Sequence, residues 1–190
     1  TDSKGESIFH DSQKQNSISD TMRWFIGGQQ RLISDFMALV APTINSYTRL
    51  VPGLWAPTNN SWGIDNRTCS LRVIPGSPSS QRVEYRLGSA DSNPYLSMAA
   101  ALASGLWGIE NKVEPGPPVH GNSYQNATNG LEGLPQTLQD SVTTLKESAP
   151  ARLYLGSDFV DHYSATREWE VAEYRRQVTD WQMNRYFEII

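Results

Sequence analysis

Residues 45–96 read NSYTRLVPGLWAPTNNSWGIDNRTCSLRVIPGSPSSQRVEYRLGSADSNPYL, a stretch with five arginines and no lysine. The arginines are Arg49, Arg67, Arg72, Arg82 and Arg86. Ahead of position 91, the only acidic residues of the stretch are at positions 65 and 84. Arginine makes planar, two-pronged contacts to carboxylates and phosphates, and here it is interleaved with glycine- and proline-rich turns. This combination is typical of an anion-binding site that loops carry on a rigid frame.

Two short runs within the stretch have the alternation of β-strands. In the first run, side chains 69, 71 and 73 point one way, and side chains 70 and 72 point the other way. In the second run, side chains 83, 85 and 87 share one face, and Arg82, Glu84 and Arg86 share the opposite face at intervals of about 7 Å. The acid between two guanidinium groups has two interpretations. It is either part of a solvated ion-pair ladder on an open sheet face, or a divalent-metal ligand beside arginines that hold anions.

Four blocks in this part of the chain resemble the second half of the catalytic domain of the glutamine synthetase superfamily. NSYTRLVPG is similar to the family's NSYKRL segment, DNRTCSLR to its arginine segment, and RVEYR to its metal- and substrate-binding strand. ADSNPYLSMAAALASGLWGIENK is similar to the ANPYL helix that follows. The blocks come in the family's order with family-like gaps, and the resemblance extends from about Ile18 to the C-terminus.

The resemblance implies a role for each charged residue that matches a family motif. Arg49 and Arg86 correspond to the arginines that hold the glutamate substrate. Arg67 and Arg72 correspond to the catalytic arginines that contact the nucleotide phosphates and the phosphoryl group in transfer. Glu84 corresponds to a carboxylate ligand of a catalytic Mg²⁺ or Mn²⁺. Glutamate and ATP are both anions, which suits arginine, and a metal ion offsets the charge on phosphate oxygens.

One position departs from the ammonia-using enzymes of the family. Those enzymes carry a glutamate in the loop after RLVPG, whereas this chain has Trp55. An indole cannot act as a base, but it can line a pocket for an apolar or larger amine. The segment WAPTNNSWGIDNRT is similar to the glutamylpolyamine and glutamylputrescine synthetase branch. We therefore expect a γ-glutamyl-amine ligase with Trp55 in the amine pocket; the alternative is that Trp55 and Trp62 are simply packed hydrophobic residues.

Composition restricts the class of protein. A chain of 190 residues with 38% hydrophobic residues can form one ordinary domain or part of a larger one. A net charge of −4 argues against general nucleic-acid binding. The single cysteine, Cys69, suits a reducing compartment, and neither a signal peptide nor an apolar membrane span is visible, so we expect a cytoplasmic protein. The histidines His10, His120 and His162 lie in separate regions, and none is a strong metal or catalytic candidate.

We interpret residues 1–190 as a single domain that is a fragment of a glutamine-synthetase-like catalytic domain. Its parts are a polar lead-in (1–17), a core with the substrate, phosphate and metal residues (18–112), a loop (113–133) and C-terminal helices (134–190). Family enzymes are more than twice as long. Their first half includes an amino-terminal β-domain and several metal-binding glutamates, which do not appear in this sequence.

Periodicity and capping residues predict the helices. Helical spacing of apolar residues and a cap at Ser19 or Asp20 predict a helix over 19–40. A second helix begins near Pro94, and its body YLSMAAALASGLWGI is apolar nearly all round, which predicts a buried helix. A short helix is expected at 134–148 and a long helix from about 158 onward. Residues 42–67 are expected to form a long loop. Pro150 is expected to break the third of these helices.

The expected fold is α+β, with a small antiparallel sheet, part of a glutamine-synthetase-type incomplete barrel, backed by four or five helices. The resemblance implies that ATP phosphorylates the γ-carboxylate of glutamate and that an amine displaces phosphate from the γ-glutamyl phosphate. Two alternatives are a glutamine synthetase that uses ammonia and a non-catalytic structural member of the superfamily. We expect the parent protein to form a homo-oligomeric ring and the isolated chain to lack ligase activity.

Overall fold

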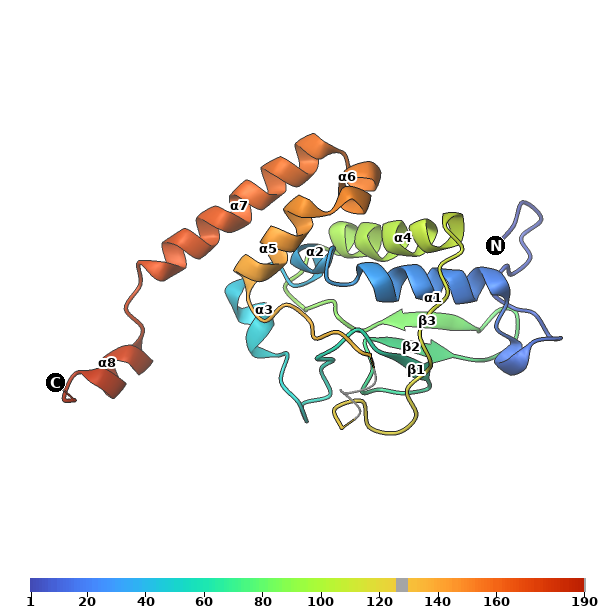
Figure 1. Cartoon of the computed structure of the whole chain (residues 1–190), viewed down its shortest axis with the longest axis horizontal. Helices are drawn as coiled ribbons and strands as arrows, with labels where there is room; N and C mark the ends of the chain where they lie inside the picture. The colour runs from blue at the N-terminus through green and yellow to red at the C-terminus, as the bar shows by residue number, and fades with distance from the viewer. Residues whose placement is uncertain (126–129, 190) are drawn as a thin grey trace.

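The computed structural model describes residues 1–125 and 130–189, and it has the expected α+β architecture. In Figure 1, α1 lies between the sheet and α4, and α5, α6 and α7 follow beside them. The elements, in chain order, are η1 (Gln15–Ser17), α1 (Asp20–Leu32), α2 (Met37–Val40), α3 (Ile44–Thr48), β1 (Trp62–Ile64), β2 (Leu71–Ile74), β3 (Arg82–Tyr85), α4 (Pro94–Glu110), α5 (Leu138–Glu147), α6 (Ala149–Leu155), α7 (Ser157–Arg175) and α8 (Asp180–Tyr186).

The sheet has three strands in the order β1-β2-β3. The two runs with strand alternation form the antiparallel pair β2–β3, as the sequence predicts, with Arg72 opposite Glu84. β1 pairs with β2 in parallel, so the sheet is mixed rather than purely antiparallel. We expected only loop at 42–67, but this segment also contains α3 and β1. A three-residue strand is too short to have a visible alternation, and its pairing with β2 comes only from the tertiary fold.

Most predicted helices are present, with boundaries that local capping decides. Ser19 caps α1 by accepting a hydrogen bond from the backbone of Met22, and Asn93 caps α4 with Pro94 in its first turn. The helix expected over 19–40 is two helices, α1 and α2, separated by a turn. Pro150 does not only end a helix: it occupies the first turn of α6, where its missing N–H costs no hydrogen bond.

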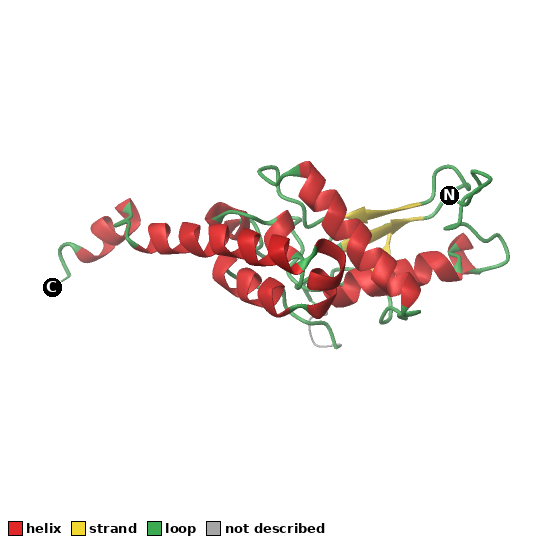
Figure 2. Ribbon diagram, turned by 90° about the horizontal axis from the view of Figure 1, so that it is seen from above, coloured by secondary structure: helices red, strands yellow, loops and turns green. Residues whose placement is uncertain are grey.

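The C-terminal helix expected from about 158 is also two helices. α7 ends at Arg175 and α8 begins at Asp180, capped by Thr179. Every residue of α8 is exposed, and the helix stands clear of the rest of the chain at the C-terminal end of the molecule (Figures 1 and 2). Within the described residues, no helix is both long enough and apolar enough to cross a membrane.

Helices α1 and α4 cross at glycines. A Cβ atom added to Gly108 would lie 2.5 Å from the Cα of Gly28 and 2.2 Å from the carbonyl oxygen of Trp24. Only glycine at both positions lets the two backbones approach this closely. Gly28 therefore serves the contact between α1 and α4, whereas a Cβ atom added to Gly27 would meet the backbone of Val113 and Pro115, in the segment after α4.

α4 is buried on one face only. Its small residues Ala100, Ala103, Ser104, Gly105 and Gly108 face the interior. Its large residues are exposed: Tyr95, Met98, Leu102 and Leu106. The expectation of a fully buried helix was therefore wrong for this second face.

Candidate active site

Glu84 lies between two guanidinium groups at one end of the β2–β3 pair. Nη1 of Arg72 donates to its Oε2 over 3.0 Å, and Nε of Arg86 donates to its Oε1 over 3.3 Å. The sequence suggested that Arg82 and Arg86 flank this acid. Arg82 instead donates to the carbonyl oxygen of Ser80, and the second guanidinium comes from Arg72, opposite Glu84 on β2. The carboxylate is 43% exposed, while both arginine side chains are largely covered.

Arg72 joins Glu84 to a second acid that sequence reasoning left without a role. Its Nε donates to Oδ1 of Asp65 over 2.9 Å, and its Nη2 donates to the same oxygen. The hydrogen bond from Arg72 and its positive charge hold the pKa of Asp65 below its usual range. Both carboxylates raise the pKa of Arg72, Asp65 more than Glu84. Asp65 and Glu84 are the only acids of the stretch before position 91, and this scarcity was the available signal.

Arg86 binds backbone carbonyls near the two acids Asp65 and Glu84, which are called the acidic pair below. Its Nη1 donates to the carbonyl oxygens of Arg67 and, over 3.3 Å, Cys69, and its Nη2 donates to the carbonyl oxygen of Trp55 over 3.2 Å. One guanidinium group therefore connects β3 to the loop that carries Trp55 and to the segment that carries Arg67. This position was predicted from sequence as a substrate-binding arginine, and its contacts to backbone carbonyls could not be read from the sequence.

Arg49 lies at the C-terminal end of α3, and its Nη2 donates to the carbonyl oxygen of Leu87 over 2.7 Å. Its Nε is buried and has no hydrogen-bond partner among the described residues. Burial lowers the pKa of Arg49, Asp91 opposes this effect, and the nearby charge of Arg86 adds to it. The interaction with Arg86 indicates that the two arginines expected to bind glutamate lie in one neighbourhood.

Asp91 anchors α3 to the segment that leads into α4. The hydroxyl of Thr43 donates to it over 2.6 Å, and the hydroxyls of Ser46 and Ser89 donate as well. These bonds, that of Ser89 above all, lower the pKa of the Asp91 carboxyl. Because Thr43 is also the N-cap of α3, the carboxylate fixes the start of the helix that ends at Arg49.

Arg67 and Trp55 line a cavity of about 380 Å³. Asp65 and His120 also line it, and His120 is one of the three histidines that the sequence did not favour as metal or catalytic residues. The Trp55 side chain is 65% exposed, and its backbone has a φ of 58°, a conformation that is uncommon for residues other than glycine. Arg67 is exposed as well. Its side chain therefore faces the cavity, while Arg72 faces the acidic pair.

Part of the expected loop 113–133 packs beside this cavity, and its residues 126–129 lie outside the described residues. The backbone of Val119 donates to the carbonyl oxygen of Trp62 over 2.8 Å, and the Tyr124 hydroxyl donates to the carbonyl oxygen of Ala56 over 3.0 Å. The side chain of Asn66 donates to the carbonyl oxygens of Val119 and Gly121. The bonds from Val119 to Trp62 and from Asn66 to this segment hold Val119 and Gly121, which line the cavity.

Residues 1–186 match the family model described as the glutamine synthetase catalytic domain. The chain belongs to the glutamine synthetase catalytic-domain family. The match begins at residue 1, ahead of Ile18, where the sequence resemblance was first visible.

Relatives within the glutamine synthetase family carry several names. Type-1 glutamine synthetase 2 of Dictyostelium discoideum is 46% identical over 98% of this chain and 36% of its own length. Glutamate–isopropylamine ligase of Pseudomonas sp is 38% identical over 100% of this chain and 41% of its own length. Gamma-glutamylethanolamide synthetase GlnA4 of Streptomyces coelicolor is 42% identical over 90% of this chain and 36% of its own length.

A solved structure supports the same family. The GmaS/ADP complex superposes with a TM-score of 0.88 at 32% identity, covering 98% of this chain and 44% of that chain. Apo GmaS without ligand gives a TM-score of 0.87 at the same identity, covering 98% of this chain and 42% of that chain. The chain therefore spans less than half the length of these relatives.

Glutamine synthetase family enzymes generally use ATP and divalent metal ions. Among the described residues, no three histidine, cysteine or acidic side chains gather in a group that could hold a metal ion. Glu84 and Asp65 are joined through Arg72, which forms an ion pair with each of them. Residues 1–125 and 130–189 therefore do not form a complete metal site, and a metal ion at Glu84 needs further ligands from outside them.

Proposed function

We propose that this chain is the arginine-bearing part of an ATP-dependent ligase that joins the γ-carboxylate of glutamate to an amine. The observation that carries the proposal is the linked set Arg72, Glu84 and Arg86, with Arg49 in the neighbourhood of Arg86. Positive groups held rigidly around an anion site stabilise charge that develops on a transferring phosphoryl group. Family membership supports the class of reaction.

Arg49 and Arg86 are proposed to orient glutamate. The buried Nε of Arg49 is a donor with no acceptor among the described residues, and such donors are rare unless a ligand satisfies them. A substrate carboxylate is a suitable acceptor, because arginine binds carboxylates with two parallel hydrogen bonds. Arg86 would exchange contacts to backbone carbonyls for contacts to the substrate when glutamate binds.

Arg67 and Arg72 are proposed to contact the phosphates of ATP and the phosphoryl group in transfer. Arg72 is oriented by two carboxylates, so its charge is held in place before substrate arrives. Glu84 is proposed to be one ligand of a divalent ion, together with carboxylates from outside this chain. A bound Mg²⁺ or Mn²⁺ would offset the negative charge of the phosphate oxygens.

The acceptor is proposed to be an organic amine larger than ammonia. Trp55 lines the cavity beside Arg67, where its indole offers an apolar wall. A relative named for ligation of glutamate to isopropylamine is 38% identical to this chain, and a relative named for a γ-glutamylethanolamide product is 42% identical. Ammonia is the second candidate, because the Dictyostelium relative at 46% identity is named a glutamine synthetase.

The test uses a full-length ligase in which residues 1–190 replace the matching segment of the Dictyostelium relative. Phosphate release from ATP and glutamate is measured with ammonium, isopropylamine, ethanolamine and putrescine. We expect stimulation by at least one organic amine. Stimulation by ammonium alone would defeat the amine assignment, and no glutamate-dependent phosphate release in a folded chimera would defeat the ligase assignment for this chain.

Two substitutions in the same chimera test the residues. Arg72→Met should lower kcat by about 10² or more, the scale for loss of one charge-stabilising donor. Arg31→Gln is the matched control, because Arg31 is exposed and its only described ion pair, with Glu132, is 3.9 Å long. Trp55→Glu should shift the preference towards ammonium. Equal loss of activity in the Arg72 and Arg31 variants would contradict the role of Arg72.

The remaining expectations stay predictions. The homo-oligomeric ring of the parent protein and its cytoplasmic location come from the resemblance and from composition. The isolated chain is predicted to have no ligase activity, because the described residues form no complete metal site. Measurable turnover by residues 1–190 alone would overturn that prediction.

A further inference from the structure

The cavity beside Arg67 holds charged groups of both signs. Arg67 and Asp65 are two residues apart in the sequence, and both line the cavity of about 380 Å³ that Trp55 also lines. The proposed reaction joins an anionic acyl phosphate to an amine, which, like the lysine side chain, is protonated near neutral pH. A site for this reaction therefore needs a cationic group for the first reactant and an anionic group for the second.

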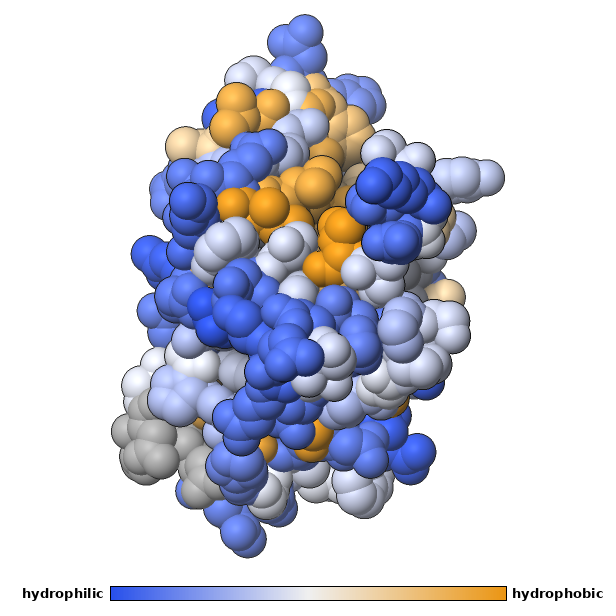
Figure 3. All heavy atoms as spheres, turned by 90° about the vertical axis from the view of Figure 1, so that its right-hand side faces the viewer, coloured by the Kyte–Doolittle hydropathy of each residue, from blue (hydrophilic) through white to orange (hydrophobic). Residues whose placement is uncertain are grey.

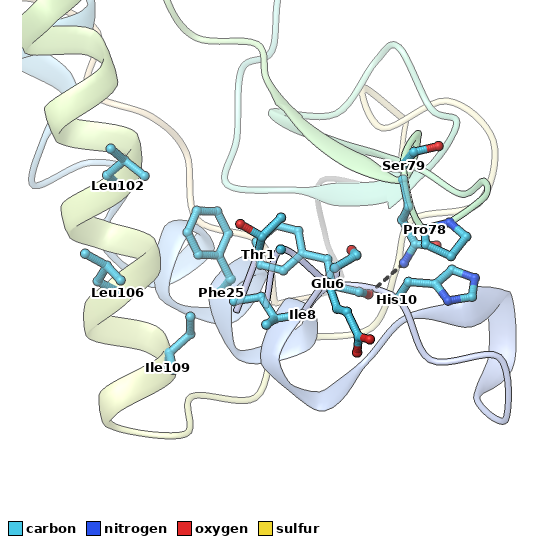
Figure 4. A pocket seen from close by; sticks show the side chains of 14 residues that line it. Thr1, Glu6, Ile8, His10, Phe25, Pro78, Ser79, Leu102, Leu106 and Ile109 are labelled. Atoms are coloured by element: carbon cyan, nitrogen blue, oxygen red, sulfur yellow. Dashed lines mark hydrogen bonds between the residues drawn. The ribbon is translucent and has the colours of Figure 1, made fainter. Parts of the chain in front are cut away.

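A larger groove elsewhere in the molecule lacks this combination. Figure 3 shows an apolar patch beside it, and Figure 4 shows Leu102 and Leu106 of α4 facing Phe25 across a hollow of about 900 Å³. Glu6 lines this groove, but neither arginine nor lysine is among the described residues that line it. The groove therefore has no guanidinium group for an acyl phosphate, unlike the cavity beside Arg67.

Asp65 is held in place by its backbone and by one carboxylate oxygen. Its N–H donates to the carbonyl oxygen of Val73 over 2.8 Å, next to the last pair of the β1–β2 ladder. Nε and Nη2 of Arg72 both donate to Oδ1, so Oδ2 takes no part in this ion pair. The side chain is 67% exposed. The carboxylate is therefore positioned through Oδ1 and can offer Oδ2 to a ligand in the cavity.

Arg72 also keeps Asp65 ionised. Its hydrogen bond and its positive charge hold the pKa of Asp65 below the usual range, so the group is a carboxylate at neutral pH and a poor proton acceptor. Asp65 is thus suited to bind a cation and unsuited to deprotonate one. Asp65 has a φ of 46° and Trp55 a φ of 58°. Such left-handed backbone is uncommon for residues other than glycine, and it clusters at active sites and ligand sites.

We propose that Asp65 binds the ammonium group of the acceptor amine through Oδ2, with the indole of Trp55 against the carbon atoms of the amine. The inference rests on the proposed ligase function and defines its acceptor more closely, as a primary alkylammonium ion that is selected by charge as well as by size. An indole face also attracts a neighbouring cation, which reinforces the carboxylate. Arg67 would face the acyl phosphate, so the two reactants meet in one cavity.

The test compares two acceptors in the full-length chimera that tests the ligase function. Ethylamine and methoxyamine have nearly the same size and shape, but at neutral pH ethylamine is an ammonium ion and methoxyamine is uncharged. KM and kcat are measured for each acceptor from glutamate-dependent phosphate release. Asp65→Asn removes the charge and keeps an oxygen that can accept from Arg72. Asp161→Asn is the matched control, because Asp161 is an exposed carboxylate that also pairs with an arginine but does not line the cavity.

We expect Asp65→Asn to raise KM for ethylamine by about tenfold, the scale for one hydrogen bond to an exposed charged group. KM for methoxyamine should stay nearly unchanged, and Asp161→Asn should change neither KM. The decisive quantity is the ratio of the two KM values. KM does not depend on the fraction of protein that is folded, so the ratio remains informative even if the variant is partly unfolded.

An unchanged ratio in Asp65→Asn would overturn the inference. If kcat fell with both acceptors at that unchanged ratio, Asp65 would act only by positioning Arg72. An equal change of the ratio in Asp161→Asn would overturn the inference as well. A folded chimera without glutamate-dependent turnover would overturn the ligase function together with this inference, whereas turnover without an effect of Asp65 would overturn this inference alone.

Discussion

The substitution Gly108→Ala tests how closely α1 and α4 pack. The added methyl group would lie 2.2 Å from the Trp24 carbonyl oxygen and 2.5 Å from the Gly28 Cα, whereas ordinary contacts of this kind begin near 3.4 Å. Both atoms belong to backbone, so neither can rotate away, and the helices must separate by roughly 1 Å. Overpacking of this kind costs about 1–3 kcal/mol and occasionally more, while alanine in a helix returns about 1 kcal/mol relative to glycine.

We place the cost of Gly108→Ala towards the upper end, since rigid backbone is on both sides, and expect a net loss of about 2 kcal/mol. For a chain of this size that corresponds to a fall in Tm of about 4–8 °C, measured by far-ultraviolet circular dichroism. Gly88→Ala is the control, because no described atom lies within 4 Å of its added Cβ. If Gly108→Ala unfolds at or above the Tm of the unsubstituted chain while Gly88→Ala is neutral, the close-crossing argument is refuted.

Three further outcomes follow from buried or hydrogen-bonded groups. Hydrogen bonds from Ser89 and Thr43 lower the pKa of Asp91, so its stabilising contribution is complete above the ordinary carboxyl pKa of about 3.9 and is lost as pH falls below it. Asp91→Asn should therefore lower the free energy of unfolding at pH 7 and have little effect near pH 2; an equal loss at both values would contradict this. Burial raises the pKa of Asp35, so its contribution is present at low pH and is lost as pH rises through the folded-state pKa. Asp35→Asn should stabilise the chain at pH 7, less any hydrogen bond that the amide fails to replace, and this gain should be smaller at pH 3; denaturant titration at pH 7 and pH 3 measures the difference. Cys69 is fully buried, and burial raises the pKa of its thiol, so a thiol reagent should label it at least about 10² times more slowly in the folded chain than in denaturant, and comparable rates would indicate that the site opens freely.

Local sequence determined much of this protein. The strand pair β2–β3 could be predicted because its side chains alternate strictly, and alternation is a local property of an extended chain. The starts of α1 and α4 could be predicted because Ser19 and Asn93 accept hydrogen bonds from backbone within the next few residues. The arginine motifs, in family order, gave the family, which the match over residues 1–186 confirms.

Tertiary structure decided which groups meet. The pairing of β1 with β2 brings Asp65 to Arg72, and neither strand's own pattern specifies that contact. Nη1 and Nη2 of Arg86 donate to backbone carbonyls from two distant segments, and every residue has a carbonyl, so no sequence signal marks these partners.

The two faces of α4 also illustrate the difference between what local sequence determines and what tertiary structure decides. Sequence alone established that this helix is apolar nearly all round, which requires burial of some kind. It could not establish which face meets α1, because that depends on glycines in both helices approaching each other in space. Burial is a property of the assembled surfaces and not of the segment, so the exposed leucines of α4 became visible only when the helices were packed together.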